Sequence, residues 1–123
     1  MRTLLFQNNV HNTKKIDIPG DVPRAINLTV RKGIKWSDLK VGETIEVCET
    51  GKEAEVTCGN QIRATIYDIK VMVFADCMNY DKMLDLEHDP ECRNYRGLFN
   101  VMRRVYDGFL QHELVTLVYY ELV

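Results

Sequence analysis

The sequence lacks a long apolar run, a paired cysteine motif and a strong net charge. No apolar stretch approaches the roughly 20 residues of a membrane-spanning helix, and the first residues lack the apolar core of about 7–15 residues found in secretory signals. The cysteines form no C-x-x-C pair, and no histidine stands at zinc-finger spacing from them. We therefore expect a cytoplasmic protein with free thiols, no membrane contact, no metal and no cofactor.

The few net charges are unevenly distributed along the chain. The formal net charge of the 123 residues is −2. Between Lys14 and Lys40 there are seven basic and three acidic residues, whereas Ala75 to Val123 carries five basic and nine acidic residues. Such asymmetry marks either a surface that faces a polyanion or an ordinary solvated face. The composition alone leaves both interpretations open.

Apolar periodicity predicts strands first and helices later. Apolar residues recur at helical spacing from Tyr95 to Phe109, and Gly108 near the end of this run is a usual helix stop. Met78–Leu86 fits a shorter helix, and Trp36–Leu39 fits one helical turn. Alternating or apolar runs predict strands at Thr3–Phe6, Ile26–Val30, Thr44–Cys48, Ala54–Cys58, Gln61–Phe74 and Leu114–Val123. This order favours an α+β fold in which helices cover one side of a β-barrel.

Several sequence landmarks follow one another in a recognisable order. A strand ends in Leu28-Thr29-Val30-Arg31, a turn contains Val41-Gly42, the long helix ends in Tyr106-Asp107-Gly108, and the chain closes on Tyr119-Tyr120-Glu121-Leu122. These landmarks resemble those of the ASCH domain family, which is part of the PUA-like superfamily. The resemblance covers roughly Ile26 to Val123. It implies a single domain over residues 1–123 with a mixed β-barrel and two covering helices, in which residues 1–25 form a divergent N-terminal strand and loop.

The family resemblance also suggests an enzymatic role. The chain is similar to small bacterial amidohydrolases that remove the acetyl group from N4-acetylcytidine, whose proposed catalytic set is a Lys, a Thr and a Glu. Thr29 and Glu91 fall on the Thr and Glu positions, but Ile26 replaces the Lys. Amide hydrolysis needs an activated nucleophile and a proton acceptor, and an isoleucine is neither. Arg24, Lys32 and Lys35 are the cations near enough in sequence to substitute.

Binding requires less than catalysis. Arg31 can hold a phosphate or a base edge with two parallel hydrogen bonds, while Arg24, Lys32 and Lys35 add positive charge and Trp36 offers a stacking surface for a base. The structural alternatives are a Trp36 that anchors the core and an Arg31 that pairs with a carboxylate. His88 and Glu91 lie in an acidic stretch, which is typical of surface residues.

Three functions follow from these residues. The preferred one is a module that binds RNA or a modified nucleoside or nucleotide in a cleft near Arg31. The second is an amidohydrolase that deacylates nucleosides of the N4-acetylcytidine type through Thr29 and Glu91. The third is a protein-binding inhibitor or accessory protein of phage type, which would use the acidic run between residues 81 and 91.

Overall fold

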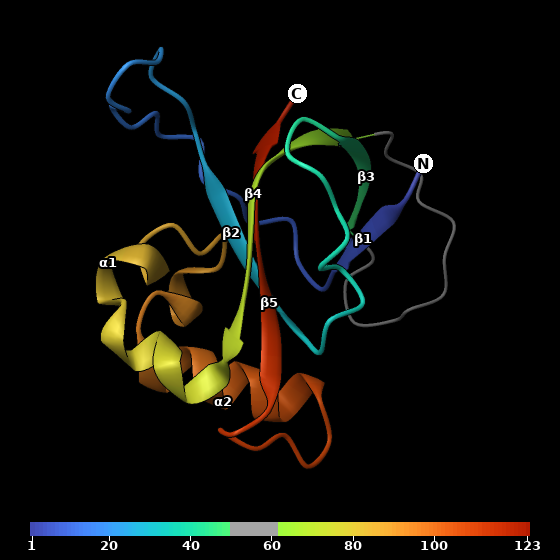
Figure 1. Cartoon of the computed structure of the whole chain (residues 1–123), viewed down its shortest axis with the longest axis vertical. Coiled ribbons are helices and arrows are strands. Elements are labelled where there is room, and N and C mark those ends of the chain that lie inside the picture. The colour runs from blue at the N-terminus through green and yellow to red at the C-terminus, as the bar shows by residue number, and fades with distance from the viewer. Residues whose placement is uncertain (50–61) are drawn as a thin grey trace.

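A computed structural model describes residues 1–49 and 62–123 of the chain. Five strands and several short helical elements make up this part (Figure 1). The strands are β1 (Thr3–Phe6), β2 (Asn27–Lys32), β3 (Thr44–Glu49), β4 (Ile62–Val73) and β5 (Leu114–Leu122). The helical elements are η1 (Phe74–Asn79), α1 (Asp81–Leu84), η2 (Pro90–Cys92) and α2 (Tyr95–Val105). The predicted α+β class is thereby confirmed.

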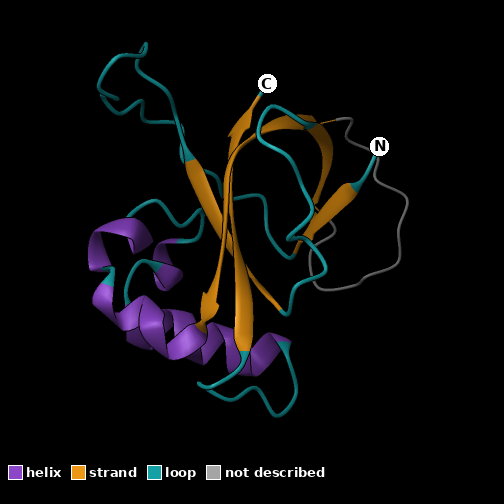
Figure 2. Ribbon diagram, viewed as in Figure 1, coloured by secondary structure: helices purple, strands orange, loops and turns teal. Residues whose placement is uncertain are grey.

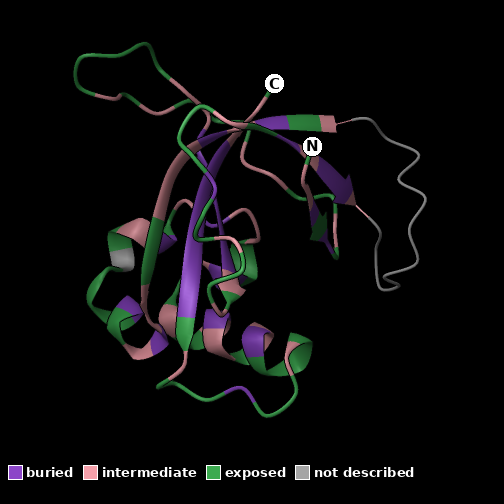
Figure 3. Ribbon diagram, turned by 45° about the vertical axis from the view of Figure 1, so that its right-hand side comes forward, coloured by how far each residue is buried: buried purple, intermediate pink, exposed green. Residues whose placement is uncertain are grey.

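The strands form one mixed sheet in the order β1-β3-β4-β5-β2. Only β1 and β3 are parallel, and the other neighbours are antiparallel. Strand β5 lies between β4 and β2, and six of its nine residues are buried (Figure 3). Its nearly continuous apolar sequence therefore matches a strand that is covered on both faces.

The sheet curves but does not close into a barrel. Among the described residues, the edge strands β1 and β2 share no backbone ladder. The side chain of Arg31 on β2 instead reaches the carbonyl of Leu5 on β1, and its Nη1 donates a hydrogen bond of 2.7 Å. The predicted barrel closure is thus not confirmed, and a charged side chain bridges the gap where a barrel would have paired strands.

Two apolar clusters pack against opposite faces of the sheet. Ile26, Leu28 and Val30 join the cluster beneath the helices, together with Leu98 and Met102 of α2. The second cluster lies on the other face and contains Leu4, Phe6, Ile45, Val47, Ile66 and Tyr120. Because side chains alternate along a strand, Thr29 and Arg31 point away from the helix-side cluster. The helices gather along one side and one end of the sheet (Figure 2).

Helix α2 begins and ends at clear local signals. The Asn94 side chain accepts a hydrogen bond of 2.8 Å from the Gly97 N–H, which is the usual N-cap contact. The helix ends at Val105, earlier than predicted, because Tyr106 is extended and Gly108 takes a positive φ of 69°. No helix in the described part of the chain is both long and apolar enough to cross a membrane.

Two other predictions are wrong, and a third concerns residues outside the described part of the chain. Met78–Leu86 is not one helix, because the backbone of Leu86 and His88 bonds to Leu28 of β2 instead. Cys48 is disulfide-bonded, contrary to the expected free thiol, whereas Cys77 and Cys92 are free and buried. Cysteine spacing along the sequence does not show which thiols meet in space. The predicted strand Ala54–Cys58 lies outside the described residues.

Candidate functional site

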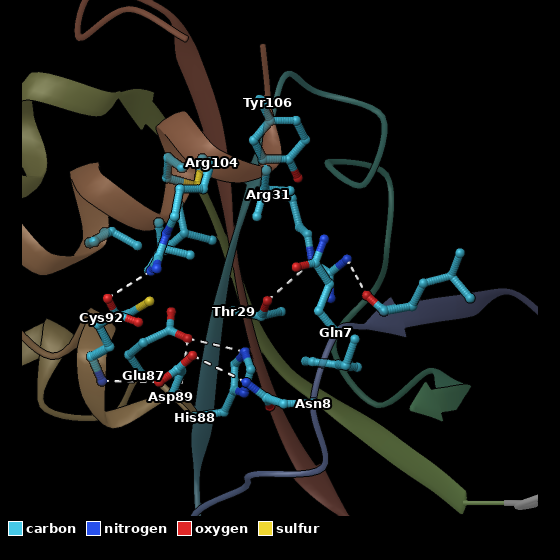
Figure 4. A pocket seen from close by; sticks show the side chains of 18 residues that line it. Gln7, Asn8, Thr29, Arg31, Glu87, His88, Asp89, Cys92, Arg104 and Tyr106 are labelled. Atoms are coloured by element: carbon cyan, nitrogen blue, oxygen red, sulfur yellow. Dashed lines mark hydrogen bonds and ion pairs between the residues drawn. The ribbon is translucent and has the colours of Figure 1, made fainter. Parts of the chain in front are cut away.

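A pocket of about 790 Å³ opens where the end of β1, strand β2, the loop after α1 and helix α2 meet. Its polar lining comes from four separate parts of the sequence (Figure 4). Asn8 comes from the N-terminal loop, Thr29 and Arg31 from β2, Glu87 and His88 from the loop, and Arg104 from α2. A volume of this size is within the usual range for small-molecule sites, roughly 300–1,000 Å³.

Arg31 is the central cation of this pocket. Its Nε donates a hydrogen bond of 3.0 Å to Thr29 Oγ1, and its guanidinium lies 4.7 Å from the centre of the Phe6 ring. Together with the Nη1 bond to Leu5, these contacts fix the plane of the guanidinium. The remaining N–H groups of Arg31 make no hydrogen bond to a described residue, and they are available to a ligand.

No carboxylate among the described residues forms an ion pair with Arg31. The expectation of a structural Arg31–carboxylate pair is therefore not met within this part of the chain. Burial lowers the pKa of Arg31, and Tyr106 and Glu87 oppose that effect. A partly buried charge without a partner is costly, so an anionic ligand would be stabilising here.

Glu87 is the most deeply buried acid of the pocket. Its exposed fraction is 2%, and its Oε1 lies 3.1 Å from Nε2 of His88. Burial raises the pKa of Glu87 to about 8, although Arg31 and Arg93 act in the opposite direction. Its other oxygen, Oε2, is buried and has no hydrogen-bond partner in the described structure. An unpartnered buried acceptor costs about 1–3 kcal/mol.

The contacts of His88 determine where the proton of this pair lies. Nδ1 of His88 is 2.8 Å from the carbonyl oxygen of Val10, which can only accept, so Nδ1 carries hydrogen. Burial lowers the pKa of His88 to about 4, so the ring is neutral and Nε2 is an acceptor at neutral pH. With its raised pKa, Glu87 is then a carboxylic acid whose Oε1 faces the accepting Nε2 of His88 and also accepts the Asp89 N–H at 3.4 Å. The prediction that His88 is a surface residue is wrong, because its side chain is only 12% exposed.

The two residues suggested for catalysis both line the pocket, but neither has a catalytic partner of the expected kind. Thr29 is 3% exposed, and its hydroxyl oxygen accepts from Arg31. Glu91 is half-exposed and forms an ion pair of 2.7 Å with Arg104. Ile26 is buried in the helix-side cluster, and none of the described lysines lines the pocket. The missing lysine amine is therefore not replaced there.

The other residues suggested for binding lie outside the pocket lining. Arg24 pairs with Asp21 and Glu121, and Lys32 pairs with Glu113. Lys35 and Arg2 lie over the Trp36 ring, at 5.1 and 4.6 Å from its centre. Trp36 is partly buried against the second apolar cluster, which agrees with its alternative interpretation as a core anchor. Of the five residues suggested for binding, the structure places only Arg31 in the pocket.

The N-terminal loop holds the pocket wall in place. Nδ2 of Asn12 donates to the Leu86 carbonyl at 2.8 Å, and its Oδ1 accepts from Arg93. Nδ2 of Asn8 donates to Asp89 at 3.1 Å. The family resemblance implies that residues 1–25 are a divergent segment, yet these contacts make the loop part of the site. A single sequence carries no signal for such contacts between distant segments.

No protein-family model matches the chain, and no curated protein or solved structure matches it either.

Proposed function

We propose that this protein is a PUA-like domain of the ASCH type that binds RNA or a nucleotide in the pocket around Arg31. The observation that carries this proposal is the guanidinium of Arg31, which lines the pocket without any described carboxylate partner. A guanidinium offers paired N–H groups that match a phosphate or a base edge. The ligand would supply the negative or accepting group that the protein leaves out.

The rest of the pocket supports a nucleotide-sized ligand. Its volume of about 790 Å³ accommodates a base together with a sugar phosphate. Apolar walls from Phe6, Leu98 and Met102 accompany the polar groups of Asn8 and Glu87. This mixture of apolar surface and a few directed polar groups is typical of sites that bind small planar molecules.

Titration of the full chain with nucleoside 5′-monophosphates and with a single-stranded RNA tests the proposal. We expect binding that weakens as salt rises, because a phosphate contact releases counterions. Arg31→Ala should lower the affinity by about tenfold or more, since it removes a charged bidentate contact. Isothermal titration calorimetry measures both effects.

A matched control is Arg24→Ala, which removes the same side chain from a surface ion pair outside the pocket lining. Its affinity should stay within about twofold of the wild type. If Arg24→Ala weakened binding and Arg31→Ala did not, the basic surface around Arg24 would be the site and the pocket proposal would fail.

One observation favours the amidohydrolase as a second candidate. Thr29 and Glu91 line the same pocket as the Glu87–His88 pair, which can donate and accept protons. Incubation with N4-acetylcytidine and chromatography for cytidine decides this question. Hydrolysis would be supported if the wild type forms cytidine and the Glu87→Gln variant does not. If no cytidine forms at high protein concentration, the amidohydrolase candidate is excluded.

The acidic run has less support as a protein-binding surface. Asp89 accepts hydrogen bonds from Asn8 and from the Glu91 N–H, and Glu91 pairs with Arg104. Glu87 is buried. Three of the five acids therefore have roles within the fold.

A further inference from the structure

The Glu87 carboxyl group has one oxygen that makes no hydrogen bond within the described fold. One carboxyl oxygen, Oε1, lies 3.1 Å from Nε2 of His88 and accepts the Asp89 N–H at 3.4 Å. The other oxygen is buried, unpartnered among the described residues and part of a side chain that lines the pocket. The carboxyl group points towards the interior of the pocket, with one oxygen on the side of His88 (Figure 4). Buried polar groups are almost always hydrogen-bonded, so a free acceptor in a pocket indicates a missing donor.

The proton between Glu87 and His88 determines what the free oxygen can do. Since Nδ1 of His88 donates to Val10, the shared proton lies between Nε2 and Oε1. Oε2 is then the carbonyl oxygen of a carboxylic acid and can only accept. The group that completes it must be a donor, such as an N–H of an amine or amide.

Arg31 provides the second half of the recognition pattern. Glu87 and Arg31 both line the pocket, but they form no ion pair in the described structure. A neutral Glu87 leaves the charge of Arg31 uncompensated, whereas an ionised Glu87 would offset that charge and repel an anion. The pocket therefore favours a ligand that carries both an anionic group and an N–H donor.

We propose that Glu87 recognises the ligand as a neutral carboxylic acid, accepting an N–H of the base through Oε2 and leaving Arg31 to the ligand's anionic group. The inference rests on the proposed nucleotide site and names its ligand class: a nucleoside phosphate whose base bears an amino group. His88 is a positioning residue that holds the carboxyl proton away from the ligand. Cytidine 5′-monophosphate is the simplest probe with these two groups.

Several neighbouring groups influence the charge of Glu87. Arg31 and Arg93 favour its ionised form, whereas burial and the nearby Asp89 favour its neutral form. The charged and titratable groups that face Glu87 and its partner are Arg31 on β2, Tyr120 on β5, Cys92 in η2, His11 in the N-terminal loop, and His88, Asp89 and Arg93 in the loop around η2. Burial raises the pKa of both Tyr120 and Cys92, so these two groups stay neutral near pH 8. The pKa of about 8 for Glu87 places its ionisation at the alkaline end of the neutral range.

The first test removes the acceptor and compares two ligands by calorimetry at pH 7. Ribose 5-phosphate has the phosphate of cytidine 5′-monophosphate but no base. The wild type should prefer the nucleotide by about tenfold or more. Glu87→Met should bring the nucleotide down to the affinity of ribose 5-phosphate, while ribose 5-phosphate itself stays within about twofold. A Glu87→Met variant that retains the preference overturns the inference.

The second test uses pH and an isosteric variant, so that it does not depend on the fold of Glu87→Met. Between pH 7 and pH 9 the wild type should lose about tenfold in affinity for cytidine 5′-monophosphate, because the ligand phosphate, with a pKa near 6, stays ionised while Glu87 ionises. Glu87→Gln keeps a neutral acceptor and should bind within about threefold of the wild type at pH 7, with no loss at pH 9.

The same series separates this inference from the proposed function. Wild-type binding that is constant over this pH range, yet abolished by Arg31→Ala, would overturn the role of Glu87 and leave the nucleotide site intact. An absence of binding to cytidine 5′-monophosphate and to RNA at pH 7 would remove the nucleotide site itself, and the inference with it. Carbon-13 NMR of the Glu87 carboxyl in the free protein gives an independent readout, and a carboxyl already ionised at pH 6 overturns the inference.

Discussion

The basic residues in and before β2 fall into two regions that differ in what surrounds their charges. Arg24 and Lys32 form the surface region, and Arg31 belongs to the pocket. Arg24 lies before the strand and pairs with Asp21 and Glu121, and Lys32 just after Arg31 pairs with Glu113. Arg31 faces the pocket, where its hydrogen bonds go to neutral oxygens of Thr29 and Leu5. The comparison shows that the cluster of positive charge in the sequence does not define the site. The site is instead defined by a partly buried charge, that of Arg31, which has no carboxylate partner among the described residues.

The largest expected effect comes from disturbing the packing of η2 against α2, both of which supply residues to the pocket lining. A Cβ added at Gly97 would lie 1.9 Å from the carbonyl oxygen of Glu91, so the backbone of η2 or α2 would have to move. We expect Gly97→Ala to destabilise the fold by about 3 kcal/mol, as overpacking against backbone does. Chemical denaturation followed by circular dichroism measures the change.

Asn100→Ala provides the control, because Asn100 is an exposed residue of the same helix. Its free energy of unfolding should change by about 0.5 kcal/mol or less. Equal stability of Gly97→Ala and the wild type would show that η2 does not pack against α2 as described.

The next largest effect concerns the pH dependence of stability, which distinguishes the buried Glu87 of the pocket from the surface acids. The folded state holds the Glu87 proton up to about pH 8, whereas the unfolded chain loses it near the ordinary value of 4.5. Burial lowers the pKa of His88 from 6.5 to about 4, so between pH 4.5 and 6.5 the pair binds one proton in both states. Above pH 6.5 only the folded state retains that proton, so stability falls by about 1 kcal/mol between pH 6.5 and pH 8 and by about 2 kcal/mol in total at higher pH.

Glu87→Gln tests this linkage, because it removes the titrating group while keeping the shape of the side chain. Urea denaturation at pH 6.5 and pH 8 should show the loss in the wild type and only a small change in the variant. A wild type that gains stability over this interval would contradict a neutral Glu87 in the folded state.

A smaller effect concerns the start of the helix that carries Arg104. Asn94 accepts the Gly97 N–H, and Asn94→Ala should cost about 1 kcal/mol, as loss of an N-cap does. Asn94→Asp should restore most of this stability, since a carboxylate caps a helix equally well. Thermal unfolding that is the same for Asn94→Ala and the wild type would refute the capping role.

The smallest effect is expected in the surface region. Lys32 forms a partly exposed ion pair with Glu113 outside the pocket lining. Lys32→Ala should change the melting temperature by about 2 °C or less and leave cytidine 5′-monophosphate affinity within about twofold. A loss comparable to that of Arg31→Ala would show that the two regions act as one binding surface.

The sequence predicts the regular elements better than their connections. Thr3–Phe6 matches β1, and the predicted strand 114–123 matches β5 to within one residue, because their apolar patterns agree with their burial. Met78–Leu86 fails because Leu28 recruits the backbone of Leu86 and His88 to the sheet edge. That pairing depends on tertiary contacts rather than on local periodicity.

The site was only partly predictable for a similar reason. Arg31 stands out because it ends a strand beside a turn. Glu87 lies among Asp81, Asp85, Asp89 and Glu91, and nothing local separates the buried acid from the exposed ones. Its burial arises from β2 and from the N-terminal loop, whose Val10 holds His88. Contacts between such distant segments leave no mark in a single sequence.

A single NMR titration tests the central claim most directly. The side-chain Nε–H signals of Arg24 and Arg31 can be followed in one nitrogen-15 spectrum while cytidine 5′-monophosphate is added to the wild-type protein. We expect the Arg31 signal to shift and saturate while the Arg24 signal stays in place, because only Arg31 lines the pocket. A saturating shift of Arg24 with an unchanged Arg31 would contradict the account.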